Sequence, residues 1–110
     1  MHEMSITQSM VEICLAHASG RRVTDVVLEI GELSGVVPES IEFCFEACTK
    51  GTLLDGATLT MEIVPALAHC GSCGKEAKVK TLFDPCPHCG GFGLALLKGE
   101  ELRVKELELL

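Results

Sequence analysis

Apolar residues near the start of the chain recur at the spacing of an α-helix. Ser5 and Gln8 have the spacing of an N-terminal capping box, and Gly20 ends the apolar run. The pattern therefore predicts an amphipathic helix over residues 5–19. The residues on its apolar face are Ile6, Met10, Ile13, Cys14 and His17.

A second helical pattern begins at Pro38, which suits the first turn of a helix because its missing N–H would have no partner there. Lys50 and Gly51 then provide a cation and a residue that tolerates positive φ at the C-terminal end. This pattern predicts a second amphipathic helix. The residues on its apolar stripe are Ile41, Cys44, Phe45 and Cys48.

Three other segments alternate between apolar and polar residues, which predicts strands that bury one face. They lie in residues 26–30, 59–63 and 101–110. In the last segment the apolar positions change parity between Val104 and Leu107, which predicts a bulge or a frayed end.

The order of these elements predicts an α/β fold with two helices on a small three-stranded sheet. Residues 69–91 interrupt this order with a segment that is rich in Cys, Gly and Pro and poor in residues for an apolar core. We therefore expect two domains. One is an α/β domain of residues 1–65 completed by a strand in residues 94–110, and the other is an inserted zinc-ribbon-like module over residues 66–93.

Four cysteines, Cys70, Cys73, Cys86 and Cys89, form two CxxC pairs, and a glycine follows each pair. Cysteines with this spacing can bind one ion when the chain turns tightly, and glycine permits the positive φ of such a turn. Four thiolates complete the tetrahedral coordination of Zn(II) and leave no open position. The spacing therefore predicts a structural zinc site. A rubredoxin-like iron centre and a redox-active dithiol are the alternatives.

Two histidines flank these cysteines, His69 before the first pair and His88 inside the second. We expect both imidazoles to be exposed beside the metal loops. Exchange of one imidazole with a cysteine ligand is an alternative that the sequence leaves open.

The composition limits the classes of function. The chain has 110 residues, enough for one modest core, and seven cysteines. No segment has the features of a secretory signal or a membrane span, so we expect a cytoplasmic protein in which closely spaced cysteines bind metal. The formal net charge of −7, without a cluster of lysine or arginine, disfavours binding to nucleic acid.

The chain begins with Met1, His2 and Glu3, ahead of the predicted helix. Solvated terminal residues without a specific role are the simplest interpretation of such a segment. A histidine next to the α-amine can also close a chelate ring on a soft or borderline metal ion. The rest of the sequence must decide between these two interpretations.

The N-terminal MHE, the segment IGELSGVVPESIEFCFE and the two late CxxC pairs followed by a short strand together resemble the HypA/HybF family of hydrogenase nickel-incorporation proteins. The resemblance covers essentially the whole chain. It implies a cytosolic nickel metallochaperone, not an enzyme, that acts with the GTPase HypB. Its target would be the precursor of the NiFe-hydrogenase large subunit.

Residue by residue, the resemblance implies that the Ni(II) cargo binds to the amine of Met1, the backbone and imidazole of His2, and Glu3. It places structural Zn(II) on the four cysteines. Square-planar Ni(II) favours nitrogen donors, and the amine, the deprotonated amide of residue 2 and its imidazole close adjacent five- and six-membered rings. The alternatives are a zinc-ribbon interaction module for nucleic acid or transcription machinery, and a rubredoxin-like electron carrier.

Overall fold

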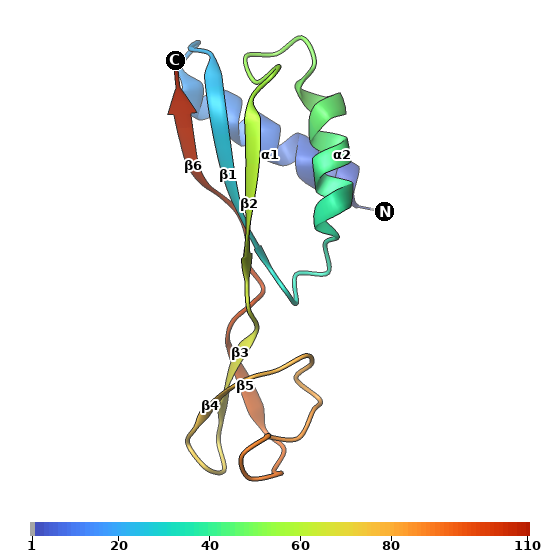
Figure 1. Ribbon diagram of the computed structural model, residues 1–110, viewed down its shortest axis with the longest axis vertical. Coiled ribbons are helices and arrows are strands. Elements are labelled where there is room, and N and C mark those ends of the chain that lie inside the picture. The colour runs from blue at the N-terminus through green and yellow to red at the C-terminus, as the bar shows by residue number, and fades with distance from the viewer. Residues whose placement is uncertain (1) are drawn as a thin grey trace. The chain divides into compact units, whose positions relative to one another are not determined.

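The structure of the protein is a computed structural model that describes residues 2–110. Over these residues the helices are α1 (Glu3–Ala18) and α2 (Pro38–Thr49). The strands are β1 (Val23–Gly31), β2 (Thr58–Val64), β3 (Leu67–Cys70), β4 (Glu76–Lys78), β5 (Leu94–Lys98) and β6 (Leu102–Leu109). They form two three-stranded sheets, with strand orders β2-β1-β6 and β4-β3-β5 (Figure 1). The predicted α/β class is confirmed.

The chain divides into two compact units. The first, here called the helical unit, contains the described residues up to Glu29, Val36–Glu62 and Arg103–Leu110. The second, here called the cysteine unit, contains Ile30–Gly35 and Ile63–Leu102. None of the helices in the described part of the chain is long and apolar enough to cross a membrane.

The core of the helical unit is built from large apolar side chains of both helices and β1. Helices α1 and α2 contact each other, and they cross in Figure 1. From Val26 to Ile30 every second residue of β1 is buried, as the alternation predicts. The fully buried side chains of this unit with the largest volumes are Leu28, Ile41, Leu54, Val23, Val26, Thr7 and Cys14.

Helix α2 begins at Pro38 as predicted. Val37 precedes it with extended φ and ψ, and Thr49 ends it with its hydroxyl donating a hydrogen bond of 2.8 Å to the carbonyl oxygen of Phe45. This bond explains why Thr49 is buried at the C-terminal end. Gly51 follows with a φ of +75°.

Helix α1 differs from the prediction at its first turn and on its buried face. The helix begins at Glu3 rather than Ser5, and His2 is its N-cap without a capping hydrogen bond from its side chain. Ile13 and His17 are exposed. The buried residues are Thr7, Met10, Val11, Cys14 and Ala18. Thr7 can occupy this face because its hydroxyl donates a hydrogen bond of 2.6 Å to the Glu3 carbonyl oxygen.

The cysteine unit contains a second sheet that the sequence pattern did not predict. Strand β3 pairs antiparallel with β4 on one side and with β5 on the other. Residues 94–110 therefore do not form one strand that completes the first sheet, because β5 pairs with β3 and only β6 joins β1.

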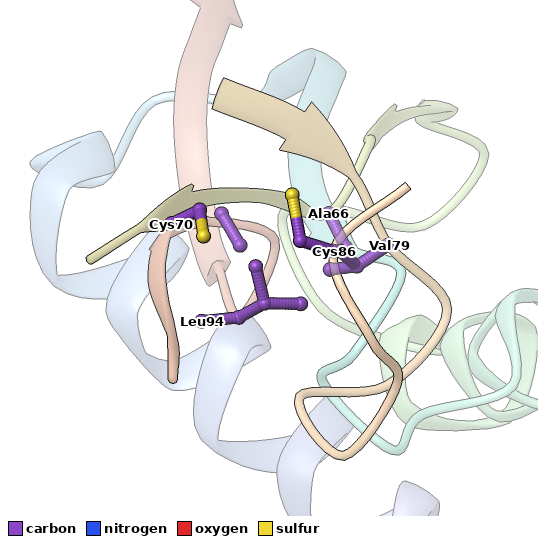
Figure 2. Packing of buried hydrophobic residues seen from close by; sticks show 6 residues of the cluster. Ala66, Cys70, Val79, Cys86 and Leu94 are labelled. Atoms are coloured by element: carbon purple, nitrogen blue, oxygen red, sulfur yellow. The ribbon is translucent and has the colours of Figure 1, made fainter. Parts of the chain in front are cut away.

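The cysteine unit also has a small core, contrary to the expectation that residues 69–91 lack one. Figure 2 shows its buried side chains gathered around the strands of this unit. The buried residues are Ala66, Ala68, Cys70, Val79, Cys86 and Leu94. Most of them are small, so the core depends on close approach of the backbone rather than on large side chains.

The backbones of three segments approach each other closely beside this core. A Cβ atom added at Gly31 would lie 2.0 Å from the carbonyl oxygen of Gly99, and one added at Gly99 would lie 2.6 Å from the Cα of Ala66. Glu32 fixes the same region, because its Oε1 accepts a hydrogen bond of 2.8 Å from the Ala66 backbone N–H. Only glycine fits at the two closest positions.

Candidate metal centre

The two CxxC segments fold into equivalent turns, here called the cysteine hooks. In the first hook the N–H of Gly74 donates to the carbonyl oxygen of Cys70 at 2.9 Å. In the second hook Gly90 donates in the same way to Cys86 at 2.8 Å. Both glycines have positive φ, +75° and +73°, which an L-residue adopts only with strain. The glycine after each pair therefore has the role that the sequence indicates.

The hooks bring all four cysteine sulfur atoms within 4.8 Å of one another. The Sγ atoms of Cys70 and Cys89 are 3.7 Å apart, and those of Cys73 and Cys86 are 3.8 Å apart. Four sulfurs bound tetrahedrally to zinc at about 2.3 Å would be separated by about 3.8 Å. The donor set and its spacing fit Zn(II), and each of these two distances joins a sulfur of one hook to a sulfur of the other.

Close packing between the hooks depends on a further glycine. A Cβ atom at Gly91 would lie 3.3 Å from the Sγ of Cys89 and 3.3 Å from the Oγ of Ser72 in the first hook. The N–H of Gly91 points to the Cys89 sulfur at 3.4 Å. The N–H of His88 points to the Cys86 sulfur at 3.4 Å. Such N–H groups stabilise negative charge on the sulfurs.

Backbone N–H groups within the hooks shift the pKa values of the thiols. Within the first hook, N–H groups led by that of Cys73 lower the pKa of Cys70 to about 6. The N–H of Cys89 is the main cause of a lowered pKa at Cys86. At Cys89 the N–H of Gly91 acts in the same direction, but hydrogen bonds to the other sulfurs outweigh it and raise the pKa to about 11. The four thiols therefore share their protons, and a metal ion that binds them all must displace the protons that the group still holds.

Zinc bound here would join the two hooks through four thiolates and leave no position for a substrate or a water molecule. Its contribution is therefore structural. The structure brings the four predicted cysteines together, and among residues 2–110 they are the group of histidines, cysteines and acids whose geometry suits a metal ion. Zinc binding by these cysteines stays a prediction.

The two flanking histidines are exposed, as expected from the sequence. His69 lies on β3 opposite Glu76 of β4, and His88 lies inside the second hook. Neither imidazole belongs to the four-sulfur cluster in the described residues.

The N-terminal residues are arranged differently from the expectation of a segment ahead of the fold. His2 is exposed, and its carbonyl oxygen accepts the first helical hydrogen bond, 2.9 Å from the N–H of Ile6. Glu3 is the first residue of α1. Met1, the remaining residue of the predicted nickel site, lies outside the described residues.

Sequence reasoning missed one contact between sulfur atoms. The Sγ of Cys48 lies 3.4 Å from the Sδ of Met4, and Cys44 lies one helical turn before Cys48. The spacing of the two cysteines is visible in the sequence. The partner on α1 is not, because the contact joins two helices.

Comparisons with known proteins agree over nearly the whole chain. A family model described as "Hydrogenase/urease nickel incorporation, metallochaperone, hypA" matches residues 1–109. The hydrogenase maturation factor HypA of Geobacter sp. (strain M21) is 69% identical over 109 residues, which cover 99% of each chain. The factor of the same name from Nostoc punctiforme is 48% identical, with 99% of this chain and 96% of that protein covered.

A solved structure has a similar fold. The solution structure of the Ni metallochaperone HypA from Helicobacter pylori matches with a TM-score of 0.70 and 26% identity. The match covers 100% of this chain and 98% of that one. These similarities favour nickel handling over a nucleic-acid module or an electron carrier. The chain belongs to the HypA family of nickel metallochaperones, which function in hydrogenase maturation.

Proposed function

We propose that this metallochaperone binds its Ni(II) cargo at the N-terminus and releases it to a hydrogenase precursor. The proposed ligands are the amine of Met1, the backbone amide nitrogen and imidazole of His2, and a donor of Glu3. The observation that carries the proposal is the exposed position of His2 as the N-cap of α1 in a member of a nickel metallochaperone family.

The N-cap position suits a ligand that must lose its amide proton. The N–H groups at the start of a helix have no acceptor within the helix, so deprotonation at His2 breaks no helical hydrogen bond. The dipole of α1 places partial positive charge at this end, which favours an anionic amide nitrogen and the carboxylate of Glu3. The backbone of α1 would thus support the ligands without enclosing them.

The zinc centre supports the same assignment by exclusion. Four thiolates fill the coordination of zinc, so that centre offers no position to cargo. Transferable Ni(II) needs another site with accessible donors. The exposed imidazole of His2 provides one, and a site on the surface can pass an ion to a partner without unfolding a core.

The partners and location complete the proposal. We infer that the chain acts without catalysing a reaction, in the cytoplasm, together with the GTPase HypB and the large-subunit precursor of NiFe-hydrogenase. Membership of a family that functions in hydrogenase maturation supports interaction with other maturation proteins. The net charge of −7 agrees with protein partners better than with nucleic acid.

Nickel titration of four zinc-loaded proteins tests the site. The proteins are the untagged chain, the chain with one residue fused ahead of Met1, His2→Ala and His17→Ala. His17 is the matched control, because it is an exposed histidine in the last turn of the same helix. Tight binding of one Ni(II) should persist in the untagged chain and in His17→Ala, and the other two should lose at least 100-fold in affinity.

The fusion separates a backbone chelate from a side-chain site. Equal Ni(II) affinity with and without the added residue would contradict the proposal. It would favour a nickel site at His69 and His88 instead. Zinc content should be the same in all four proteins. Glu3→Gln keeps the backbone and should weaken nickel binding less than His2→Ala, unless the carboxylate is itself a ligand.

A further inference from the structure

Two sulfur atoms are in contact where α1 packs against α2, a third lies one helical turn away on α2, and the proposed nickel and zinc sites use none of them. The Sδ of Met4 lies 3.4 Å from the Sγ of Cys48, a residue 44 positions later in the chain. Cys44 lies four residues before Cys48, so both thiols project from the same face of α2. The side chains are also electrostatic neighbours, because burial and then the charge of Cys44 raise the pKa of Cys48.

Two of the three sulfur-containing side chains, those of Met4 and Cys48, are accessible from the surface. Met4 is 45% exposed, Cys48 is half-buried and Cys44 is 8% exposed. Met4 and Cys44 both line a cleft of about 370 Å³ that also contains Glu3. A small ion can therefore contact Met4 and Cys48 at the surface and approach the buried Cys44 from the cleft, whereas Cys14 is 1% exposed and does not line that cleft.

Two thiols and a thioether are a soft donor set. Thioethers bind Mg(II), Ca(II) or Ni(II) poorly, whereas thiolate and thioether together select soft ions such as Cu(I). The set also lacks the four thiolates that define the zinc centre. Methionine side chains are flexible enough to adjust to a metal with few preferred angles.

We propose that Met4, Cys44 and Cys48 form a second metal site, specific for a thiophilic monovalent cation, with Cu(I) as the biological example. The metal keeps its oxidation state on binding. Each thiol that becomes a ligand releases one proton to solvent, and the thioether binds without proton loss. The site is independent of the nickel proposal, since it uses no donor of Met1, His2 or Glu3.

The experiment adds Cu(I) to zinc-loaded, reduced protein without oxygen, in competition with a chromophoric Cu(I) chelator. Zinc release is followed in parallel, because the hooks also contain thiolates. The chain has four methionines, so selective ¹³C labelling of their methyl groups reports the location directly. The first equivalent of Cu(I) should shift the Met4 methyl signal, leave those of Met10 and Met61 in place, and release no zinc.

Variants test the same assignment. Met4→Leu and Cys48→Ser should each lower the Cu(I) affinity at least tenfold without loss of zinc. Met61→Leu is the matched control, because it removes a half-buried thioether from β2 and should bind Cu(I) like the parent. Met4 is partly exposed, so Met4→Leu keeps the fold even if substitutions at Cys44 do not.

Two results would overturn the proposal. One is equal Cu(I) affinity in the parent, Met4→Leu and Cys48→Ser. The other is zinc release from the first equivalent of Cu(I) with no change at Met4, which would place the ion at the hooks. His2→Ala separates the two proposals, because it should lose nickel and keep Cu(I).

Discussion

The two units of this protein are stabilised in different ways. The helical unit buries large apolar side chains such as Leu28, Ile41 and Leu54. The core cluster of the cysteine unit consists of two alanines, two cysteines, one valine and one leucine, and its cysteines, Cys70 and Cys86, belong to the four-sulfur cluster. Free energy from apolar burial grows with buried area, so it is large in the first unit and small in the second.

This difference assigns separate tasks to the two units. In the cysteine unit we expect zinc to supply the stability that a core of small side chains lacks, because zinc binding in small modules contributes on the order of 10 kcal/mol. We expect the helical unit to fold without a metal ion, because large apolar side chains form its core. It can therefore present the N-terminus of α1, and the nickel ligands proposed there, whether or not cargo is bound.

Removal of zinc should have the largest effect and should divide the molecule along this difference. We expect Cys73→Ala, or a strong chelator, to abolish amide protection in the two hooks and to weaken the pairing of β3 with β4 and β5. Protection in α1, α2 and β1 should stay close to that of the parent. Hydrogen exchange followed by mass spectrometry measures both parts in one sample.

The control for this prediction is Cys48→Ala, which removes a thiol from the helical unit and should keep one zinc ion per chain. Full protection of the hooks after zinc removal would show that the small core folds alone. In that case the metal would not be the main source of stability in the cysteine unit.

The same difference decides how much the sequence could predict. Helix α2 and strand β1 follow directly from periodic large apolar residues. Strands β3 and β4 have four and three residues, too few for a periodic signal. The pairing of β3 with β5 joins residues that are distant in the chain, such as Cys70 and Leu94. The second sheet therefore could not be predicted from local patterns.

The candidate sites show a similar division. The four zinc ligands were predictable because CxxC followed by glycine specifies the turn within a few residues. The true start of α1 was not, because His2 is its N-cap without a side-chain hydrogen bond and the capping pattern at Ser5 is not used. The Met4–Cys48 contact depends on the packing of two helices. The nickel ligands remain a prediction.

Truncation of the large core side chain Leu28 should affect the helical unit and spare the zinc centre. Leu28 is 1% exposed, and replacing such a leucine by alanine costs about 2–5 kcal/mol because it leaves a cavity. Urea unfolding monitored by the helical circular dichroism signal measures the loss. Leu97→Ala, at a position 52% exposed on β5, is the control and should change stability by less than about 0.5 kcal/mol. Loss of zinc from folded Leu28→Ala would show that the stability of the metal centre depends on the helical core.

An effect in the lower half of the range for Leu28→Ala should come from adding a single methyl group to the cysteine unit, at Gly31. Its φ is not positive, so alanine there introduces no backbone strain, but the new Cβ would lie 2.0 Å from the Gly99 carbonyl oxygen. That oxygen accepts a hydrogen bond of 2.7 Å from the N–H of Leu33, which the required shift would disturb. We expect Gly31→Ala to cost about 3 kcal/mol, the upper part of the usual range for overpacking.

Gly35→Ala is the matched control in the same unit, because Gly35 has a φ of +79° and no atom near its missing Cβ, so only strain of about 1 kcal/mol applies. Urea unfolding of both zinc-loaded variants gives the comparison. A larger loss in Gly31→Ala supports stabilisation by close backbone approach, and an equal or smaller loss would mean that the small side chains of this unit are not packed at the observed distances.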